Sequence, residues 1–267
     1  MDYVNPKEVA DSMLKSALTK SGLGAMDILV RGALSGALLG ISVALACLAI
    51  TQTGYGIVGA LVFPVGFAII VILGLELVTG SFALVPLAFF ERRIKGIQMV
   101  RTLSLAFAGN LLGSLLFGLL FWLASASGDG PQALSSIEQM LVNLAEKKTI
   151  GYAQYGTAGL ATAFVKGILC NWMVCMGVVM AMTSQSTVGK IMACAMPVFM
   201  FFALGYEHAV VNMFVIPTGM LLGANVSFSD WWLSNQLIVT AGNIVGGLLF
   251  TGLPLYYSLR KTAPTAN

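Results

Sequence analysis

The sequence predicts an all-α membrane protein with six transmembrane helices, arranged as two halves of opposite orientation in which the second and fifth helices are broken. Three observations support this prediction: an apolar composition, six long apolar segments, and short motifs repeated about half a chain apart. Hydrophobic residues make up 58% of the 267 residues and charged residues only 9%, with a mean hydropathy of +0.89. Little sequence is left outside a bilayer, so we expect neither an enzyme nor a nucleic-acid-binding protein.

The first 24 residues are too polar to span a membrane and are expected to form an amphipathic cytoplasmic helix. Asn5 can cap this helix, Pro6 suits its first position, and Glu8 has the spacing of a capping box. The apolar stripe of the helix consists of Val9, Met13, Leu14, Ala17 and Leu18. Such a helix should lie at the membrane surface, ahead of a single transmembrane domain of residues 25–260 and a tail of residues 261–267.

Six apolar segments follow, each at or above the roughly 20 residues that a spanning helix needs. They lie near residues 27–50, 57–90, 99–125, 156–184, 190–226 and 233–258. Basic residues gather around the start of the first span, between the second and third, at the start of the fifth and after the last. This asymmetry predicts a multi-pass protein of the cell membrane with both termini in the cytoplasm.

Three motifs recur in the same order in the two halves of the chain. A Gly-Asn pair at residues 109–110 returns at 242–243, "RGALSG" from Arg31 returns as "KGILCN" from Lys166, and "GLELVTG" from Gly74 returns as "GYEHAVV" from Gly205. The halves cover about residues 25–125 and 156–260. Because each half holds three spans, an odd number, the halves must insert in opposite directions. Inverted repeats of this kind place a substrate site between broken helices, here the second and the fifth.

Four ionisable side chains fall within the apolar segments away from their first few residues, at the expected membrane depth: Glu76, Lys166, Glu207 and His208. A charge at membrane depth costs roughly 2.5–3.5 kcal/mol on insertion scales, so such groups usually face the protein interior or water. We expect Glu76 and Glu207 to cap backbone amides that the helix breaks leave free. Lys166 has two open interpretations: it attracts a substrate anion, or it snorkels to the membrane interface.

His208 is the only histidine of the chain and directly follows Glu207. It is either a neutral core imidazole or a pore-lining group that exchanges a proton near neutral pH. Its place at a predicted break favours the pore, because irregular backbone at membrane depth is tolerated where it lines a cavity. A lone histidine without an HExxH motif predicts no metal site, and the four cysteines are expected to be small buried residues.

The motifs resemble those of the formate/nitrite transporter family, and most of all a bacterial formate channel. The resemblance rests on "LELVTG" from Leu75, "KGILCNWMVC" from Lys166, "GYEHAVVNMFVIPTG" from Gly205 and the two Gly-Asn pairs. It implies an aquaporin-like fold and a homopentamer in the lipid bilayer, each protomer with its own pore. It also implies permeation of small monovalent weak-acid anions together with a proton, and no cofactor.

Matched position by position, the resemblance implies roles for individual residues. His208 is similar to the family's central pore histidine, Thr79 to the threonine that faces it, and Asn243 to an asparagine that hydrogen-bonds nearby. The implied apolar constrictions are Phe63, Phe67 and Phe201, and the implied polar network behind the histidine contains Glu207, Asn171 and Asn212. Phe67 departs from the leucine expected at the cytoplasmic slit, and this substitution could narrow the slit or change its selectivity.

The block "NMFVIPTG" from Asn212 resembles formate channels more than nitrite channels, and this resemblance implies formate as the substrate. Nitrite and hydrosulfide channels of the same family are alternatives. A neutral-solute channel of the water or glycerol type is a further alternative with the same inverted repeat, but the paired Asn-Pro-Ala loops typical of those channels do not occur. The pattern also leaves open whether the N-terminal helix gates the cytoplasmic mouth.

Overall fold

The computed structural model describes residues 2–125 and 134–261, and this part of the chain is helical apart from loops and one isolated β-bridge. Four helical stretches are long and apolar enough to cross a membrane. They are α2 (Ala25–Thr53), α6 (Gly96–Ser125), α9 (Gly156–Ala181) and the run Phe228–Arg260. That run is built from α12 (Phe228–Trp231), the π-helical turn η1 (Trp232–Gln236), α13 (Leu237–Gly247), a second π-helical turn η2 (Leu248–Gly252) and α14 (Leu253–Lys261). The predicted tail, residues 261–267, begins with the last residue of α14, and residues 262–267 lie outside the described residues.

The second and fifth predicted spans are broken, as expected. The second consists of α3 (Gly56–Val62), α4 (Pro64–Ile72) and α5 (Val78–Phe90), and the fifth of α10 (Thr187–Ala203) and α11 (Ala209–Leu221). Each break turns at a glycine in the left-handed region, Gly74 with φ 63° and Gly205 with φ 65°, a conformation that glycine adopts without steric cost. That each set of short helices crosses a membrane as one span stays a prediction.

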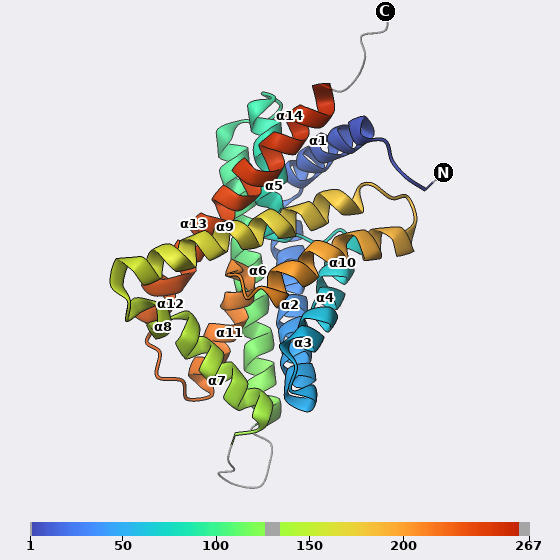
Figure 1. Ribbon diagram of the computed structural model, residues 1–267. Coiled ribbons are helices and arrows are strands. Elements are labelled where there is room, and N and C mark those ends of the chain that lie inside the picture. Colours follow the sequence, from blue (N-terminus) through green and yellow to red (C-terminus); the bar gives the residue numbers. More distant parts are fainter. Residues whose placement is uncertain (1, 126–133, 262–267) are drawn as a thin grey trace, which may run out of the picture.

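The long helices of each half pack through the repeated glycines. A methyl group on Gly32 of α2 would lie 3.0 Å from the Cα of Gly109 in α6, and one on Gly167 of α9 would lie 3.3 Å from the Cα of Gly242 in α13. Small residues let helix backbones approach this closely. The Gly-x-x-x-Gly spacing of α2 therefore serves contacts within one protomer. Figure 1 shows α2 running beside α6, with α9 lying across them.

The N-terminal helix α1 (Pro6–Gly22) begins at Asn5, whose Oδ1 accepts a hydrogen bond from the Lys7 amide at 3.1 Å, as predicted. Its apolar face is buried against α5 and α14, where Met13 shares a cluster with Leu84 and Tyr256. The sequence predicted a helix lying at the membrane surface, yet the structure covers the apolar stripe with protein. Figure 1 shows α1 alongside α14 at one end of the molecule.

A second amphipathic helix, α7 (Ser136–Lys148), precedes the second half and was not predicted. It packs against α11 and is followed by the short α8 (Ile150–Ala153). Ser135 and Glu138 form a reciprocal capping box at its start. Because α1 precedes the first half in the same way, each half of the repeat consists of an amphipathic helix followed by the spans.

Candidate functional site

The two helix breaks bring the N-termini of α5 and α11 together, and a pair of polar side chains meets there. His208 Nε2 lies 3.1 Å from Thr79 Oγ1, with His208 only 2% exposed and Thr79 fully buried. His208 is also the N-cap residue of α11, and its Nδ1 accepts a hydrogen bond from the Val211 amide at 3.2 Å. An acceptor Nδ1 leaves the ring proton of a neutral imidazole on Nε2, so Nε2–H donates to Thr79 Oγ1.

The arrangement around the Thr79–His208 pair favours a negatively charged ligand. The N-terminus of a helix carries a partial positive charge, and both α5 and α11 begin beside the Thr79–His208 pair. The Nε2–H group is a donor, and the Thr79 hydroxyl keeps its own proton while it accepts. A positive charge on the imidazole would be opposed by both helix ends and would cost the cap bond to Val211. Without a ligand, the neutral form of His208 is therefore the stable one.

Two asparagines cap the half-helices, a role the sequence analysis assigned to the glutamates. Asn243 accepts from the Ala209 amide at 2.8 Å and donates to the carbonyl oxygens of Gly167 at 2.8 Å and Glu207 at 3.0 Å. Asn110 makes the same three bonds in the other half, to the Val78 amide and to the carbonyls of Gly32 and Glu76. Asn243 thus bonds the main chain on both sides of His208 rather than its imidazole.

The two glutamates instead pair with lysines from the amphipathic helices. Lys20 Nζ of α1 lies 2.9 Å from Glu76, and Lys148 Nζ of α7 lies 2.9 Å from Glu207. The predicted capping of backbone amides is wrong, because an asparagine amide supplies both the acceptor and the donors that a break needs, whereas a carboxylate can only accept. Lys148 was not among the predicted site residues. Its counterpart Lys20, also at the end of an amphipathic helix, was the available clue.

Glu207 carries more partners than Glu76. Besides Lys148, its carboxylate accepts from the Tyr152 hydroxyl at 3.0 Å and from Asn212 Nδ2 at 2.8 Å. Lys166, whose role the sequence left open, does not bond the carboxylate. Its Nζ lies 5.7 Å from the centre of the Tyr152 ring, and its carbonyl accepts a hydrogen bond from the Glu207 amide. Tyr152, like Lys148, was missed because it lies outside the predicted spans.

Asn171 holds the backbone of Thr79 in the Thr79–His208 pair. Its Nδ2 donates to the carbonyl of Thr79 at 3.0 Å and to that of Asn243 at 2.6 Å. The Cys175 thiol lies 3.2 Å from the same Thr79 oxygen. Asn171 therefore joins α9 and α13 to the start of α5, while the predicted pair Glu207 and Asn212 bond each other.

The three predicted phenylalanines are all buried but divide into two groups. The Phe201 ring stacks on the His208 ring with centroids 5.8 Å apart, and Phe63 meets Phe201 edge to face at 5.7 Å. Phe67 does not share these ring contacts among the described residues. It lines a cavity that Leu77 also lines. Leu77 was not among the predicted residues, although it occupies in the first repeat the position that His208 occupies in the second.

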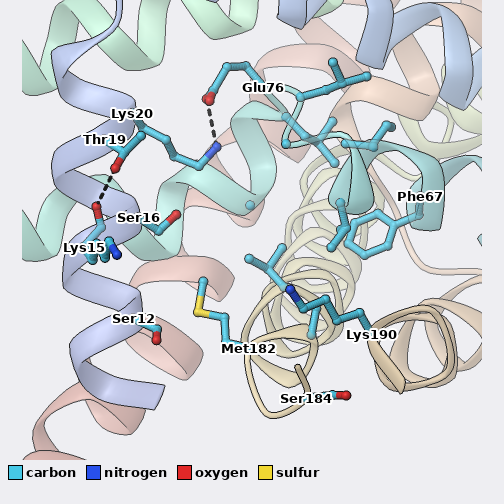
Figure 2. A pocket seen from close by; sticks show the side chains of 18 of the residues that line it. Ser12, Lys15, Ser16, Thr19, Lys20, Phe67, Glu76, Met182, Ser184 and Lys190 are labelled. Atoms are coloured by element: carbon cyan, nitrogen blue, oxygen red, sulfur yellow. Dashed lines mark hydrogen bonds and ion pairs between the residues drawn. The ribbon is translucent and has the colours of Figure 1, made fainter. Parts of the chain in front are cut away.

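This cavity, which we call the α1 cavity, has a volume of about 750 Å³ and lies between α1, the break before α5, and the α9–α10 connection. Figure 2 shows Lys15 and Lys20 on one side of the cavity, and Phe67 and Lys190 on the other. The charged groups that line it are Glu8, Lys15, Lys20, Arg31, Glu76 and Lys190, an excess of two positive charges. Neither Thr79 nor His208 lines the cavity, although Leu77 and Gly80, on either side of Thr79 in the sequence, do.

A short N-terminal strap borders the same cavity. The Val4 amide donates to the Thr183 carbonyl at 2.8 Å, and the Gln185 amide donates to the Asp2 carbonyl at 3.0 Å. These bonds tie residues 2–4 to the α9–α10 connection, whose Ser184 also lines the cavity. The cavity wall is therefore completed by the chain that precedes the first span.

Comparison with known proteins decides the family. Residues 7–257 match the formate/nitrite transporter family along nearly the whole chain. The chain belongs to this family. Its members among similar proteins include a probable formate transporter of Methanothermobacter thermautotrophicus, 36% identical over 75% of this chain and 74% of that protein. The formate channel FocA of Haemophilus influenzae is 33% identical over 77% and 75%, and the uncharacterized transporter YrhG of Bacillus subtilis is 30% identical over 98% and 96%.

Solved structures of the family share the fold. A structure described as an FNT family ion channel superposes with a TM-score of 0.81 at 27% identity, covering 94% of this chain and 98% of that one. A pentameric formate channel with formate bound gives 0.70 at 26% identity, covering 88% and 96%. The predicted all-α channel fold is thus confirmed, and these family relatives are channels and transporters. Like them, this chain is a membrane transport protein for small anions.

Proposed function

We propose that this protein is a formate channel of the cell membrane in which His208 exchanges a proton with the passing anion. The observation that carries the proposal is the Thr79–His208 pair, buried at the meeting point of two helix N-termini. Nε2–H and the threonine hydroxyl offer two donors to a carboxylate, and the helix ends add positive potential. The family relatives described as formate channels and a formate transporter support the choice of substrate.

The apolar residues near the Thr79–His208 pair explain why the anion would need a proton in order to pass. An ion crossing Phe67 and Leu77 from the α1 cavity, or Phe63 and Phe201 elsewhere along the path, would lose its water without gaining polar partners. Protonation of formate to formic acid removes most of this cost. Lys20 and the other cations around the cavity would first concentrate the anion at its mouth.

The hydrogen bonds of His208 make proton uptake dependent on the anion. A second ring proton must go to Nδ1, which breaks the bond to the Val211 amide and places a cation beside two helix N-termini. A carboxylate at Nε2 offsets that charge, so we expect imidazolium to form only while an anion is bound. Transfer of the Nε2 proton to a carboxylate oxygen then gives neutral formic acid and leaves a neutral imidazole with its proton on Nδ1. Uptake of a proton from water at Nε2 and its release to water from Nδ1 restore the resting tautomer and the bond from the Val211 amide.

We further propose a homopentamer in the bilayer with one pathway per protomer and both termini in the cytoplasm. The pentameric formate channel among the structural relatives supports the assembly, and the distribution of basic residues supports the orientation. In this orientation the α1 cavity is the cytoplasmic vestibule.

The test is flux of formate, nitrite, lactate and hydrosulfide into proteoliposomes across a pH series, for the wild type and His208→Asn. Asparagine can still cap α11 but cannot titrate, so it separates the structural from the proton-exchanging role. We expect formate flux to dominate in the wild type and the variant to lose its pH response. Exclusion of all four anions, with passage of water or glycerol, would overturn the channel assignment in favour of a neutral-solute channel.

Dominant nitrite or hydrosulfide flux would keep the family mechanism but replace formate as the substrate. An unchanged pH profile in His208→Asn would remove the histidine from the proton pathway. Each outcome therefore contradicts a different part of the proposal.

A further inference from the structure

The π-helical turn η1 places two neighbouring amide side chains in the protein interior. Asn235 and Gln236 are both fully buried, and the Leu237 amide closes the turn by bonding the Trp232 carbonyl, five residues back. Consecutive residues of an α-helix point about 100° apart, and the wider π-turn brings them closer to one face. Gln236 accepts a hydrogen bond from the Trp231 indole and donates one to the Ala209 carbonyl.

Asn235 reaches the network behind the histidine. Its Oδ1 accepts from Asn212 Nδ2 at 2.8 Å, and its own Nδ2 donates to the Lys148 carbonyl at 2.8 Å. Asn212 Nδ2 also donates to Glu207, and Lys148 Nζ donates to the same carboxylate oxygen. The four residues therefore form a closed ring, which we call the Asn235 ring, joining α7, the break before α11, α11 itself and η1.

The first half of the repeat has no such ring. By the spacing of the repeated motifs, Asn212 corresponds to Ser81 and Asn235 to Thr102, both buried. Neither hydroxyl has a hydrogen-bond partner among the described residues. Glu76 is paired with Lys20 as Glu207 is with Lys148, so the ion pair alone is common to both halves. The half that contains the ring also contains His208, at the position where the first half has Leu77.

We propose that Asn235 is a positioning residue for proton exchange at His208: it closes the ring that holds Lys148 against Glu207 and so keeps the two charges offset beside the imidazole. The proposal rests on the proposed function of His208. If the ring served the fold alone, the equivalent break before α5, which has the same backbone course, would need it as well.

The charged and titratable groups around the ring are few. Lys148 comes from α7, Tyr152 from α8 and Cys170 from α9, while Lys166 lies beyond the Tyr152 ring. From η1 only the neutral amides of Asn235 and Gln236 face this region. Loss of the Asn235 bond to the Lys148 carbonyl frees the end of α7 and separates Lys148 from Glu207. The less compensated carboxylate then favours the protonated imidazole.

The test measures the pH of half-maximal formate flux in proteoliposomes for wild type, Asn235→Leu and Asn235→Asp. We expect the midpoint to move to higher pH by about one unit in Asn235→Leu. Asn235→Asp has the same shape and can still accept from Asn212, so it should assemble even where the leucine variant does not. It should shift the midpoint in the same direction, because it loses the donor and adds a negative charge.

The matched control is Thr102→Val, which removes the unpartnered hydroxyl at the equivalent position of the first half and should leave the midpoint unchanged. Wild-type midpoints in both assembled Asn235 variants, or lower flux without a shift, would overturn the proposal and leave Asn235 a structural residue. An equal shift in Thr102→Val would overturn it too. A wild type without any pH response would instead refute the proposed function of His208 itself.

Discussion

At the scale of single residues, the difference between a histidine and a leucine on one backbone conformation sets the chemistry of the site. His208 has φ −115° and ψ 119°, and Leu77 has φ −113° and ψ 114°, each directly before a half-helix. The backbone therefore presents both side chains in the same way. At this backbone position only the second half presents a side chain that can donate to an anion, because the first half has leucine there.

Thr79 should be needed for its hydroxyl rather than its shape. Thr79→Val keeps the volume but removes the partner of Nε2–H, and we expect formate flux to fall at least about tenfold, because one buried hydrogen-bonding group is left unpaired at roughly 1–3 kcal/mol. Thr79→Ser keeps the hydroxyl and should retain most of the flux. Initial rates in proteoliposomes of equal protein content measure both. Equal loss in the two variants would show that the methyl group matters instead.

The residues at the centre of the site could be predicted from the sequence because they lie in short motifs that can be recognised there. His208, Thr79 and Asn243 lie in motifs that recur or that resemble the family. Lys148, Tyr152 and Asn235 were missed, because they come from the surface helices and from a π-turn, where neither apolar periodicity nor repeat spacing predicts an inward side chain. The two interpretations of Lys166, attraction of a substrate anion and snorkelling to the membrane interface, stay predictions.

At the scale of helices, the helical segments were predictable to within a few residues, whereas the residues that hold the two breaks together were not. Long apolar runs determine α2, α6 and α9 directly. The breaks depend on Asn110 and Asn243, which lie on helices far away in the sequence. Their capping role follows from helix packing, because the glycine beside each asparagine lets the two helices approach.

The glycine contacts between α2 and α6 should therefore be intolerant of even one methyl group. A Cβ on Gly36 would overlap the Asn110 carbonyl, so we expect Gly36→Ala to lower stability by about 1–3 kcal/mol or more. The helix shift would also disturb the Asn110 cap. Thermal unfolding in detergent measures the effect, with Gly56→Ala as the control, since no atom lies within 4 Å of a methyl group there. Equal melting temperatures for the two variants would refute this account.

At the scale of the whole molecule, the N-terminal helix is part of the packed structure and of the α1 cavity. It buries Met13 and Ala17 against α5 and α14, supplies Lys20 to Glu76, and forms one wall of the cavity. Its removal would uncover an apolar surface and leave a buried carboxylate without its cation. Both effects destabilise a folded protein.

Deletion of residues 1–21 should accordingly lower the thermal stability of the assembled protein, and Lys20→Met should lower it less because α1 stays in place. Unfolding midpoints in detergent compare the two. The same deletion tests whether α1 restricts access to the cavity: a gate predicts faster formate flux from the α1 side. Unchanged flux with intact assembly would exclude gating by this helix.

The matching ion pairs Lys20–Glu76 and Lys148–Glu207 also bear on the descent of the protein. They make α1 and α7 counterparts, so the ancestral duplicated unit comprised a surface helix together with three spans. Two identical copies of such a unit, inserted in opposite directions, would have formed a symmetric pathway with equal breaks. The present chain has kept the shared lysine, glutamate and asparagine in both copies, and the histidine with its asparagine ring in one. Divergence of the two copies thus gave the pathway its chemical polarity.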